Sequence, residues 1–297
     1  MRTFAAVTTC HEGGYNTYGR QMVETFDRHW PKDVPLYLYA ENFVPDLPSD
    51  RIVHRDLLAE CPELVAFKER HKDNPAAHGK QGRSRLRVSM DWRKPKLRVR
   101  RVEWGLGYLW DAVRFSHKTF AIFDAAEKCP ADVLFWVDAD TLMFADIPRD
   151  FLEDVMPADC LLSYLARPKF SECGFVGYNL RHPAIRDFLA EFKALYTTDR
   201  LFKEEQFHDS FLFDVVRKRF ERKGHKTHDI AEGLGLTAGH VFVNSRLGQY
   251  MDHMKGERKD SGASFETDFV VSREEGYWKE KAAKSPAKTS PDAVPRA

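Results

Sequence analysis

The feature that most constrains the fold is the run VLFWV at residues 133–137, five apolar residues with no polar break. A strand that is apolar at every position suits the middle of a parallel sheet, where both faces are covered. In the N-terminal region, an apolar run at 3–9 precedes a polar loop at 10–19, a helical pattern at 20–30 and a second apolar run ending at Glu41. This strand–loop–helix–strand order is typical of a βαβ unit. We therefore expect an α/β fold that binds ligands at the carboxyl ends of its strands.

Two aspartates follow the apolar run directly, in the sequence DVLFWVDADTLMF. Asp138 and Asp140 are two positions apart, so in extended chain both side chains point to the same side. Carboxylates so placed suit Mg²⁺ or Mn²⁺, which leave coordination positions for substrate phosphates. Solvated aspartates in a turn would give the same tripeptide, but acids inside an apolar stretch are costly without a compensating partner. The sequence therefore predicts that both aspartates bind a divalent cation.

A second motif lies near the C-terminus, HMKGERK at residues 253–259. A neutral His253 can complete the coordination of a cation such as Mn²⁺. Gly256 lets the backbone approach a phosphate closely, and Lys259 adds a compact positive charge against a diphosphate. An exposed, charged helix end would look the same in isolation. Paired with the two aspartates, the segment indicates a third metal ligand and a diphosphate contact.

With these two motifs, the sequence resembles the nucleotide-sugar transferases of the GT-A fold, most closely their glycogenin-like, retaining branch. That branch combines a mid-chain Asp-x-Asp after a buried strand with a C-terminal His-x-x-Gly-x-x-Lys, which matches here at all three fixed positions. The usual continuation of the second motif, Pro-Trp, is replaced by Asp260-Ser261. The resemblance implies a GT-A-like, Rossmann-type mixed sheet flanked by helices, a UDP-sugar donor and retention at the anomeric carbon.

We therefore predict a metal-dependent glycosyltransferase with Mn²⁺ or Mg²⁺ as cofactor and a glycan, a small molecule or a nucleic acid as acceptor. One domain is expected over 1–278, with a basic insertion at 71–101 and a disordered tail at 279–297 that is rich in Lys, Ala, Pro and Ser. Further elements are expected as strands at 160–164, 175–179 and 240–244, and as helices at 111–127, 184–196 and 209–220.

The setting of the protein is indicated by its cysteines and its hydropathy. The five cysteines are scattered and form no Cys-x-x-Cys pair, which fits reduced thiols and a cytoplasmic protein. No stretch is long and apolar enough to span a bilayer. The N-terminal apolar run is broken by polar residues, so it is interpreted as a strand rather than a signal peptide.

Three other functions share part of the pattern. A haloacid-dehalogenase-like phosphatase also has two aspartates after an apolar strand, but its pattern requires Thr or Val where Leu142 stands. A sugar-phosphate nucleotidyltransferase would need a Gly- and Arg-rich loop after the first strand, and CHEGGYN has no basic residue except a histidine. A non-enzymatic nucleic-acid-binding protein would use the basic insertion and would not need the aspartates.

Residues near the donor are expected on the first loop and on the helix before the aspartates. Arg114 and Lys118 are four apart on one helical face, where they either reach the nucleotide phosphates or form an ordinary exposed pair. Thr8, Thr9 and Tyr15 flank the first loop and are candidates for the base and ribose, Tyr15 by stacking. Ordinary loop polarity explains these three equally well.

Two segments, SECGFVGYN and QFHDSF, resemble the acceptor-side loops of these transferases. Glu172 lies next to a Gly-rich turn, and His208 and Asp209 stand at the start of a helix. An acid beside the anomeric carbon stabilises an oxocarbenium-like centre or orients the acceptor hydroxyl. For Asp209, a role as an N-cap with Ser210 is the structural alternative.

The basic insertion concentrates charge in a chain whose formal net charge is only +1. Basic residues interleaved with Trp92 and Trp104 fit three roles: a lid over the anionic donor, a nucleic-acid surface, or a solvated loop. We favour the lid, because the segment immediately precedes the helix with Arg114 and Lys118. The basic residues are Lys80, Arg83, Arg85, Arg87, Arg93, Lys94, Lys96, Arg98, Arg100 and Arg101.

Overall fold

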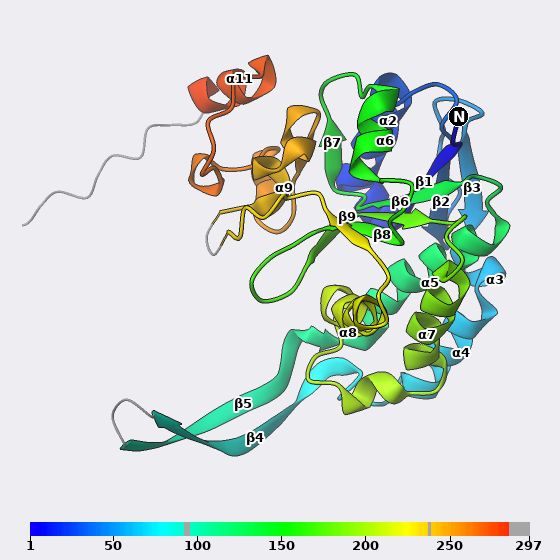
Figure 1. The fold of residues 1–297 in the computed structure, drawn as a ribbon. Helices are drawn as coiled ribbons and strands as arrows, with labels where there is room; N and C mark the ends of the chain where they lie inside the picture. Colours follow the sequence, from blue (N-terminus) through cyan, green and yellow to red (C-terminus); the bar gives the residue numbers. More distant parts are fainter. Residues whose placement is uncertain (92–95, 237–238, 285–297) are drawn as a thin grey trace, which may run out of the picture.

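The computed structural model describes residues 1–91, 96–236 and 239–284 of the chain. Its centre is a seven-stranded mixed sheet with helices on both faces (Figure 1), which confirms the expected α/β fold class. The strand order across the sheet is β10-β8-β9-β6-β1-β2-β3. In chain order these strands are β1 (Phe4–His11), β2 (Leu36–Glu41), β3 (Ile52–Asp56), β6 (Val133–Val137), β8 (Leu162–Leu165), β9 (Glu172–Asn179) and β10 (Thr227–Asp229).

The apolar run VLFWV forms β6, the middle strand of this sheet, and all its residues are buried. β6 runs parallel to β1 on one side and antiparallel to β9 on the other. Val133, Phe135 and Val137 belong to one hydrophobic core, whereas Leu134 and Trp136 belong to a second. The run needs no polar residue because each face of the strand packs against its own core.

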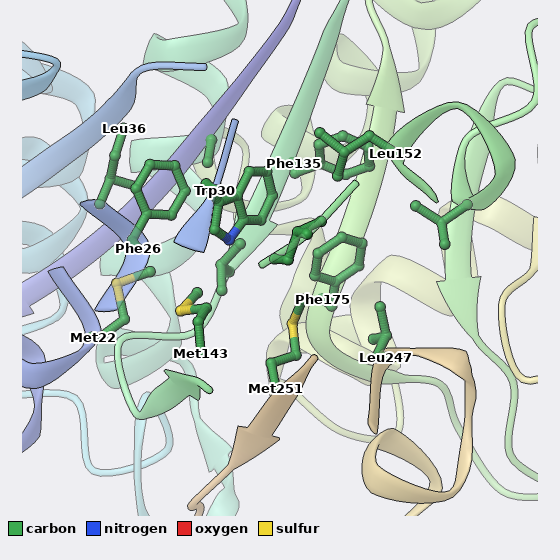
Figure 2. Close-up of a cluster of buried hydrophobic side chains, with 14 of the residues drawn as sticks. Met22, Phe26, Trp30, Leu36, Phe135, Met143, Leu152, Phe175, Leu247 and Met251 are labelled. Atoms are coloured by element: carbon green, nitrogen blue, oxygen red, sulfur yellow. The ribbon is translucent and has the colours of Figure 1, made fainter. Parts of the chain in front are cut away.

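The two cores lie on opposite faces of the sheet. On one face, side chains of α2 (Arg20–His29) and α6 (Arg149–Val155) pack with Phe135 and Phe175, whose ring centroids are 5.2 Å apart (Figure 2). The second core is formed with four other helices. These are α4 (Pro62–His71), α5 (Ala112–Lys128), α7 (Ile185–Thr197) and α8 (Asp209–Arg222).

Short helical elements complete the described part of the chain. None of the helices in the described ranges has the length and apolar character needed to cross a membrane. The short α-helices are α1 (Glu12–Gly14), α3 (Leu57–Glu60), α9 (Val241–Asn244), α10 (Arg258–Ser261) and α11 (Gly276–Lys284). The other short elements are the π-helical η1 (Tyr15–Gly19) and the 3-10 turns η2 (Arg200–Lys203), η3 (Arg246–Gln249) and η4 (Glu266–Asp268).

A small antiparallel ribbon joins the two sequence motifs. It consists of β7 (Thr141–Met143), which follows the aspartates, and β11 (Met251–His253). Their register sets His253 opposite Thr141, and the amide of Met254 donates to the carbonyl of Asp140 at 2.9 Å. Two segments more than a hundred residues apart in sequence therefore meet beside Asp140.

The basic insertion expected at 71–101 has regular structure over most of its length. It is a β-hairpin of β4 (His78–Asp91) and β5 (Lys96–Asp111), and it projects away from the body of the protein (Figure 1). The physical reason lies in the alternation of apolar residues with polar or basic residues from Leu86 to Met90, a period of two that stabilises a ladder. Trp92, Arg93 and Lys94 lie outside the described residues.

Two other expectations are corrected by the structure. Residues 240–244 form no strand; Val241–Asn244 is the helical turn α9, capped by the His240 imidazole, which accepts from the amide of Phe242. Residues 279–284 of the expected disordered tail belong to α11, because Trp278 anchors that helix by donating to the carbonyl of Gly248 at 2.7 Å. The remainder of the tail, 285–297, lies outside the described residues.

Candidate active site

The carboxyl ends of three parallel strands surround a cavity of about 820 Å³. Cys10 from β1, Glu41 from β2 and Asp138 after β6 all line it. Ligands bind at this edge in open α/β sheets. The cavity is therefore the candidate active site.

The two aspartates and His253 meet at one wall of the cavity. Asp138 and Asp140 line it, and His253 lies fully buried beside them. The Nε2 atom of His253 is 3.3 Å from Oδ2 of Asp138 and 3.1 Å from Oδ1 of Asp140. One potential ligand atom from each of the three residues lies within 4.8 Å of the others. This spacing allows all three to coordinate one cation.

The charges of the cluster stabilise one another. Burial opposes charge on His253, but Asp140 and Asp138 outweigh it and raise its pKa to about 9. Loss of hydration would raise the pKa of Asp138, yet Lys118 and His253 hold it far below the usual value. The positive charge of the protonated imidazole thus balances the two carboxylates as a metal cation would. The imidazole must release its proton when a metal binds.

Gly174 on β9 sets the position of the His253 ring. A Cβ atom at residue 174 would lie 2.5 Å from Cε1 and 2.7 Å from Nδ1 of that ring. The carbonyl of Gly174 also accepts from the amide of Asp138 at 2.9 Å. A residue without a side chain is therefore required where β9 passes behind the cluster.

Lys118 lines the cavity, and its ammonium group is paired with two acids. Its Nζ atom is 2.9 Å from Oδ1 of Asp138 and 2.8 Å from Oδ2 of Asp209, and its side chain is 13% exposed. Burial opposes its charge, but the two carboxylates raise its pKa well above the ordinary value. Trp136 also donates to Oδ1 of Asp138, at 2.6 Å. Lys118 therefore fixes the carboxylates of Asp138 and Asp209 relative to each other.

We expect Lys118→Met to lower the free energy of unfolding by about 3 kcal/mol, because it leaves two largely buried carboxylates without their shared cation. Denaturant unfolding measures this loss. Lys128→Met is the matched control: Lys128 also bridges two acids, Glu60 and Asp124, but is 42% exposed, so its loss is expected to cost no more than about 1 kcal/mol. Equal losses in the two variants would show that the Lys118 pairs are no stronger than surface pairs.

Glu172 is buried at the start of β9 and lines the cavity. It forms an ion pair with Lys255, and its Oε2 atom is 3.3 Å from Nη1 of Arg167. Burial opposes its charge, but Lys255 and His253 hold its pKa well below the ordinary value. Glu172 is thus an ionised carboxylate beside the cluster, as a charge-stabilising group would need to be.

His208 and Asp209 also line the cavity, at the first turn of α8. The residue at the N-cap is His208, and Asp209 is the first helical residue, with its carboxylate on Lys118 rather than capping the helix. The ring of His208 packs against Phe170 with centroids 4.6 Å apart, and burial lowers its pKa. A neutral imidazole and a carboxylate therefore stand side by side in the cavity wall.

The candidates on the first strand and loop divide into two groups. Thr9 lines the cavity, and its hydroxyl donates to the carbonyl of Tyr39 at 2.7 Å. Thr8 is fully buried and Tyr15 packs against Phe43 in the core, so neither lines the cavity. The reason is local: residues 12–19 are helical instead of a loop, and this winding turns Tyr18 to the cavity in place of Tyr15.

Three further candidates lie near the cluster. Arg114 lines the cavity, and within the described part of the chain no carboxylate is paired with it. Gly256 lines it too, with φ +64° and open space around it. Lys259 lies 3.0 Å from Oδ2 of Asp140, with Nζ 4.1 Å from the centroid of the Tyr18 ring. The C-terminal motif therefore presents a backbone and a cation next to the aspartates.

The sequence reasoning missed a second polar cluster at the end of β2. Glu41 and His117 line the cavity, and Oε1 of Glu41 is 2.6 Å from Nζ of Lys68 and 3.2 Å from Nε2 of His117. The hydrogen bond to His117, more than burial, sets the pKa of Glu41, which falls to about 2. The position of Glu41 after the second strand was the available signal, because neighbouring parallel strands end at the same edge.

Comparisons with known proteins give no family for this chain by sequence. No family model matches it, and no curated protein matches it either. A glycosyltransferase involved in the glycosylation of the major capsid of PBCV-1 has a similar fold, with 11% identity, coverage of 87% of this chain and 99% of that chain, and a TM-score of 0.45. Mouse xyloside xylosyltransferase 1 has 9% identity, coverage of 76% and 84%, and a TM-score of 0.44.

The glycosyltransferase GlyE of Streptococcus pneumoniae TIGR4 has 10% identity, coverage of 77% of this chain and a TM-score of 0.40. The matched region spans less than half of GlyE, 46% of its length. All three similar structures are glycosyltransferases. Because their TM-scores are below 0.5, the function of this chain has to be inferred from its own cavity.

Proposed function

We propose that this protein is a metal-dependent glycosyltransferase that transfers a sugar from a nucleotide-diphosphate donor, most simply a UDP-sugar. The observation that carries the proposal is the meeting of Asp138, Asp140 and His253 in the wall of a cavity at the carboxyl edge of the sheet. From the C-terminal motif, Lys259 contacts Asp140, and Gly256 lines the same cavity. These are the groups that a cation and a diphosphate require together.

The three side chains of the cluster offer ligand atoms that suit Mn²⁺ or Mg²⁺. Two carboxylates and one imidazole suit a borderline cation such as Mn²⁺. Neither ring nitrogen of His253 makes a hydrogen bond of good geometry within the described residues, although both are buried. A buried nitrogen without such a partner gains most from a metal. When bound, the cation supplies charge neutralisation for the departing nucleoside diphosphate.

The residues around the cluster bind and orient the diphosphate. Gly256 has no side chain to keep the phosphates from its backbone, and Lys259 places its ammonium group against Asp140. Arg114 faces the same cavity from the first turns of α5 and supplies a further cation. The three groups would hold the leaving diphosphate in one orientation while the sugar reacts.

Glu172, His208 and Asp209 serve the sugar and the acceptor in this proposal. Glu172 is an ionised, buried carboxylate, and Lys118 holds Asp209 in a fixed position. Either acid can stabilise positive charge at the anomeric carbon, and a neutral His208 can accept a proton from the acceptor hydroxyl. Retention of anomeric configuration is part of the proposal. The phosphatase alternative fits less well, because Oδ1 of Asp138 accepts from both Lys118 and Trp136 and so makes a poor nucleophile.

A screen of nucleotide sugars for hydrolysis tests this function without knowledge of the acceptor. Wild-type protein is incubated with UDP-, GDP-, ADP- and TDP-linked sugars, with Mn²⁺ or with a chelator. We expect release of nucleoside diphosphate from one donor class, lost on chelation and restored by Mn²⁺. Failure of every donor, or hydrolysis that is indifferent to chelation, would contradict the proposal.

A further inference from the structure

The β4–β5 hairpin carries an exposed apolar face that nothing in the described structure covers. Its side chains are between 47% and 69% exposed. The strand register sets Val88 opposite Val99 and Met90 opposite Leu97, so these residues form one continuous strip. An isolated two-stranded hairpin is marginally stable in water, and exposed apolar strips usually mark an interaction site. The strip consists of Leu86, Val88, Met90, Leu97 and Val99.

The same hairpin has a large excess of basic over acidic residues. Of the 46 Lys and Arg residues, ten lie in 78–111, and of the 45 Asp and Glu residues only three do. The remaining residues therefore hold 36 basic and 42 acidic side chains and are net negative. Along the ladder, the positions between the apolar residues include the register pairs Arg87 with Arg100 and Ser89 with Arg98. The partner must accept both an apolar strip and a dense positive charge.

We propose that the β4–β5 hairpin binds the surface of an anionic lipid bilayer. A bilayer surface offers both complements at once: the apolar strip enters the boundary between headgroups and acyl chains, and the basic residues meet lipid phosphates. The basic positions alternate with the apolar ones, so they belong to the other face of the two-stranded ribbon. Arginine is in general long enough to reach lipid headgroups from such a position. The hairpin also projects clear of the body (Figure 1), so a flat surface can approach it.

Two other partners fit only half of these observations. A nucleic acid would neutralise the charge but would leave the apolar strip in water. A second copy would cover the strip but would bring together two segments that each carry an excess of seven positive charges. The strip and the charge together favour lipid.

One end of the hairpin lies at the candidate active site. Tyr108, at the end of β5 nearest the body, lines the candidate active-site cavity and is 61% exposed. Binding through the hairpin would therefore tether the cavity to the bilayer. The proposal concerns binding alone and does not rest on the transferase activity.

Vesicle flotation with the full-length protein tests the proposal. We expect it to float with vesicles of phosphatidylcholine mixed with phosphatidylglycerol, and to float far less with phosphatidylcholine alone. Each basic side chain near an anionic surface contributes about a factor of 5 to partitioning, so the double variant Arg87→Gln with Arg100→Gln is expected to bind about 25-fold more weakly. Val88→Ser with Val99→Ser is expected to lower partitioning at least about tenfold.

Matched controls lie outside the hairpin: Arg186→Gln on α7, and Val44→Ser, whose side chain is 83% exposed. Both are expected to bind vesicles like the wild type, and thermal unfolding of all variants checks that the body is folded. Absence of binding, or equal binding by hairpin and control variants, would overturn the proposal. Tighter binding to duplex DNA than to vesicles would overturn it in favour of nucleic acid. If the wild type were a dimer and the double variant Val88→Ser with Val99→Ser were a monomer, the proposal would be overturned in favour of a second copy.

Discussion

Replacing Asp138 or Asp140 by asparagine is expected to lower donor hydrolysis at least about 10³-fold in the presence of Mn²⁺. Each substitution removes a charged ligand of the proposed cation while keeping the size of the side chain. For Asp138 it also removes a negative charge that pairs with Lys118 and His253. Initial rates of nucleoside diphosphate release, measured at saturating Mn²⁺, give the size of the effect.

Asp50→Asn is the control for this prediction, because Asp50 is an exposed acid outside the cavity. It is expected to hydrolyse the donor like the wild type. Melting curves of all three variants separate loss of metal binding from loss of folding. Full activity of both Asp138→Asn and Asp140→Asn would mean that the cavity works without a cation at this wall.

The second large effect is expected from a glycine that touches no substrate. Gly174→Ala would bring a methyl group to 2.5 Å from Cε1 of His253, closer than Cβ atoms approach other atoms. The imidazole is fully buried and has to move, so its Nε2 atom leaves the position shared with Asp138 and Asp140. Displacing a ligand through its support typically weakens metal binding about 10- to 100-fold. Calorimetric titration with Mn²⁺ in the presence of UDP measures this loss.

Gly276→Ala is the matched substitution, because a Cβ atom at residue 276 meets nothing within 4 Å. It is expected to leave Mn²⁺ affinity unchanged. If Gly174→Ala bound Mn²⁺ as tightly as Gly276→Ala did, the His253 ring would not be a ligand held by its contact with β9.

The sequence was sufficient to predict the features that depend on local pattern. The run VLFWV required a strand covered on both faces, and its residues do alternate between two cores. Asp138 and Asp140 were placed together by their spacing alone. That His253 would join them required tertiary structure, because it depends on the pairing of β7 with β11. The sequence indicated that contact only through the presence of both motifs in one chain.

Other residues could not be placed from sequence for identifiable reasons. Lys118 was expected at the donor phosphates, but its partners Asp138 and Asp209 lie on separate elements that only the fold brings together. Tyr15 was a candidate because residues 10–19 were interpreted as a loop, but residues 12–19 are helical, which buries Tyr15 and leaves Tyr18 at the cavity.

The hairpin was missed for a different reason. Its apolar residues alternate as strand residues do, but they are exposed rather than buried, and the surrounding arginines dominate the composition. The expectation of a lid followed from the position of the segment just before the helix with Arg114 and Lys118, and it stays a prediction. The ladder of β4 and β5 projects from the body, and Tyr108 at the near end of β5 lines the cavity.

We propose that Asp138, Asp140 and His253 hold a cation against the donor diphosphate, and pulsed electron paramagnetic resonance of bound Mn²⁺ detects the ligands of that cation. With wild-type protein, Mn²⁺ and UDP, we predict one bound ion with a nitrogen coupling from the His253 ring and a phosphorus coupling from the nucleotide. The nitrogen coupling should vanish in His253→Gln while the phosphorus coupling remains. Bound Mn²⁺ that shows no nitrogen coupling in the wild type would contradict His253 as a ligand. Bound Mn²⁺ that shows no phosphorus coupling with UDP would contradict the contact between cation and diphosphate.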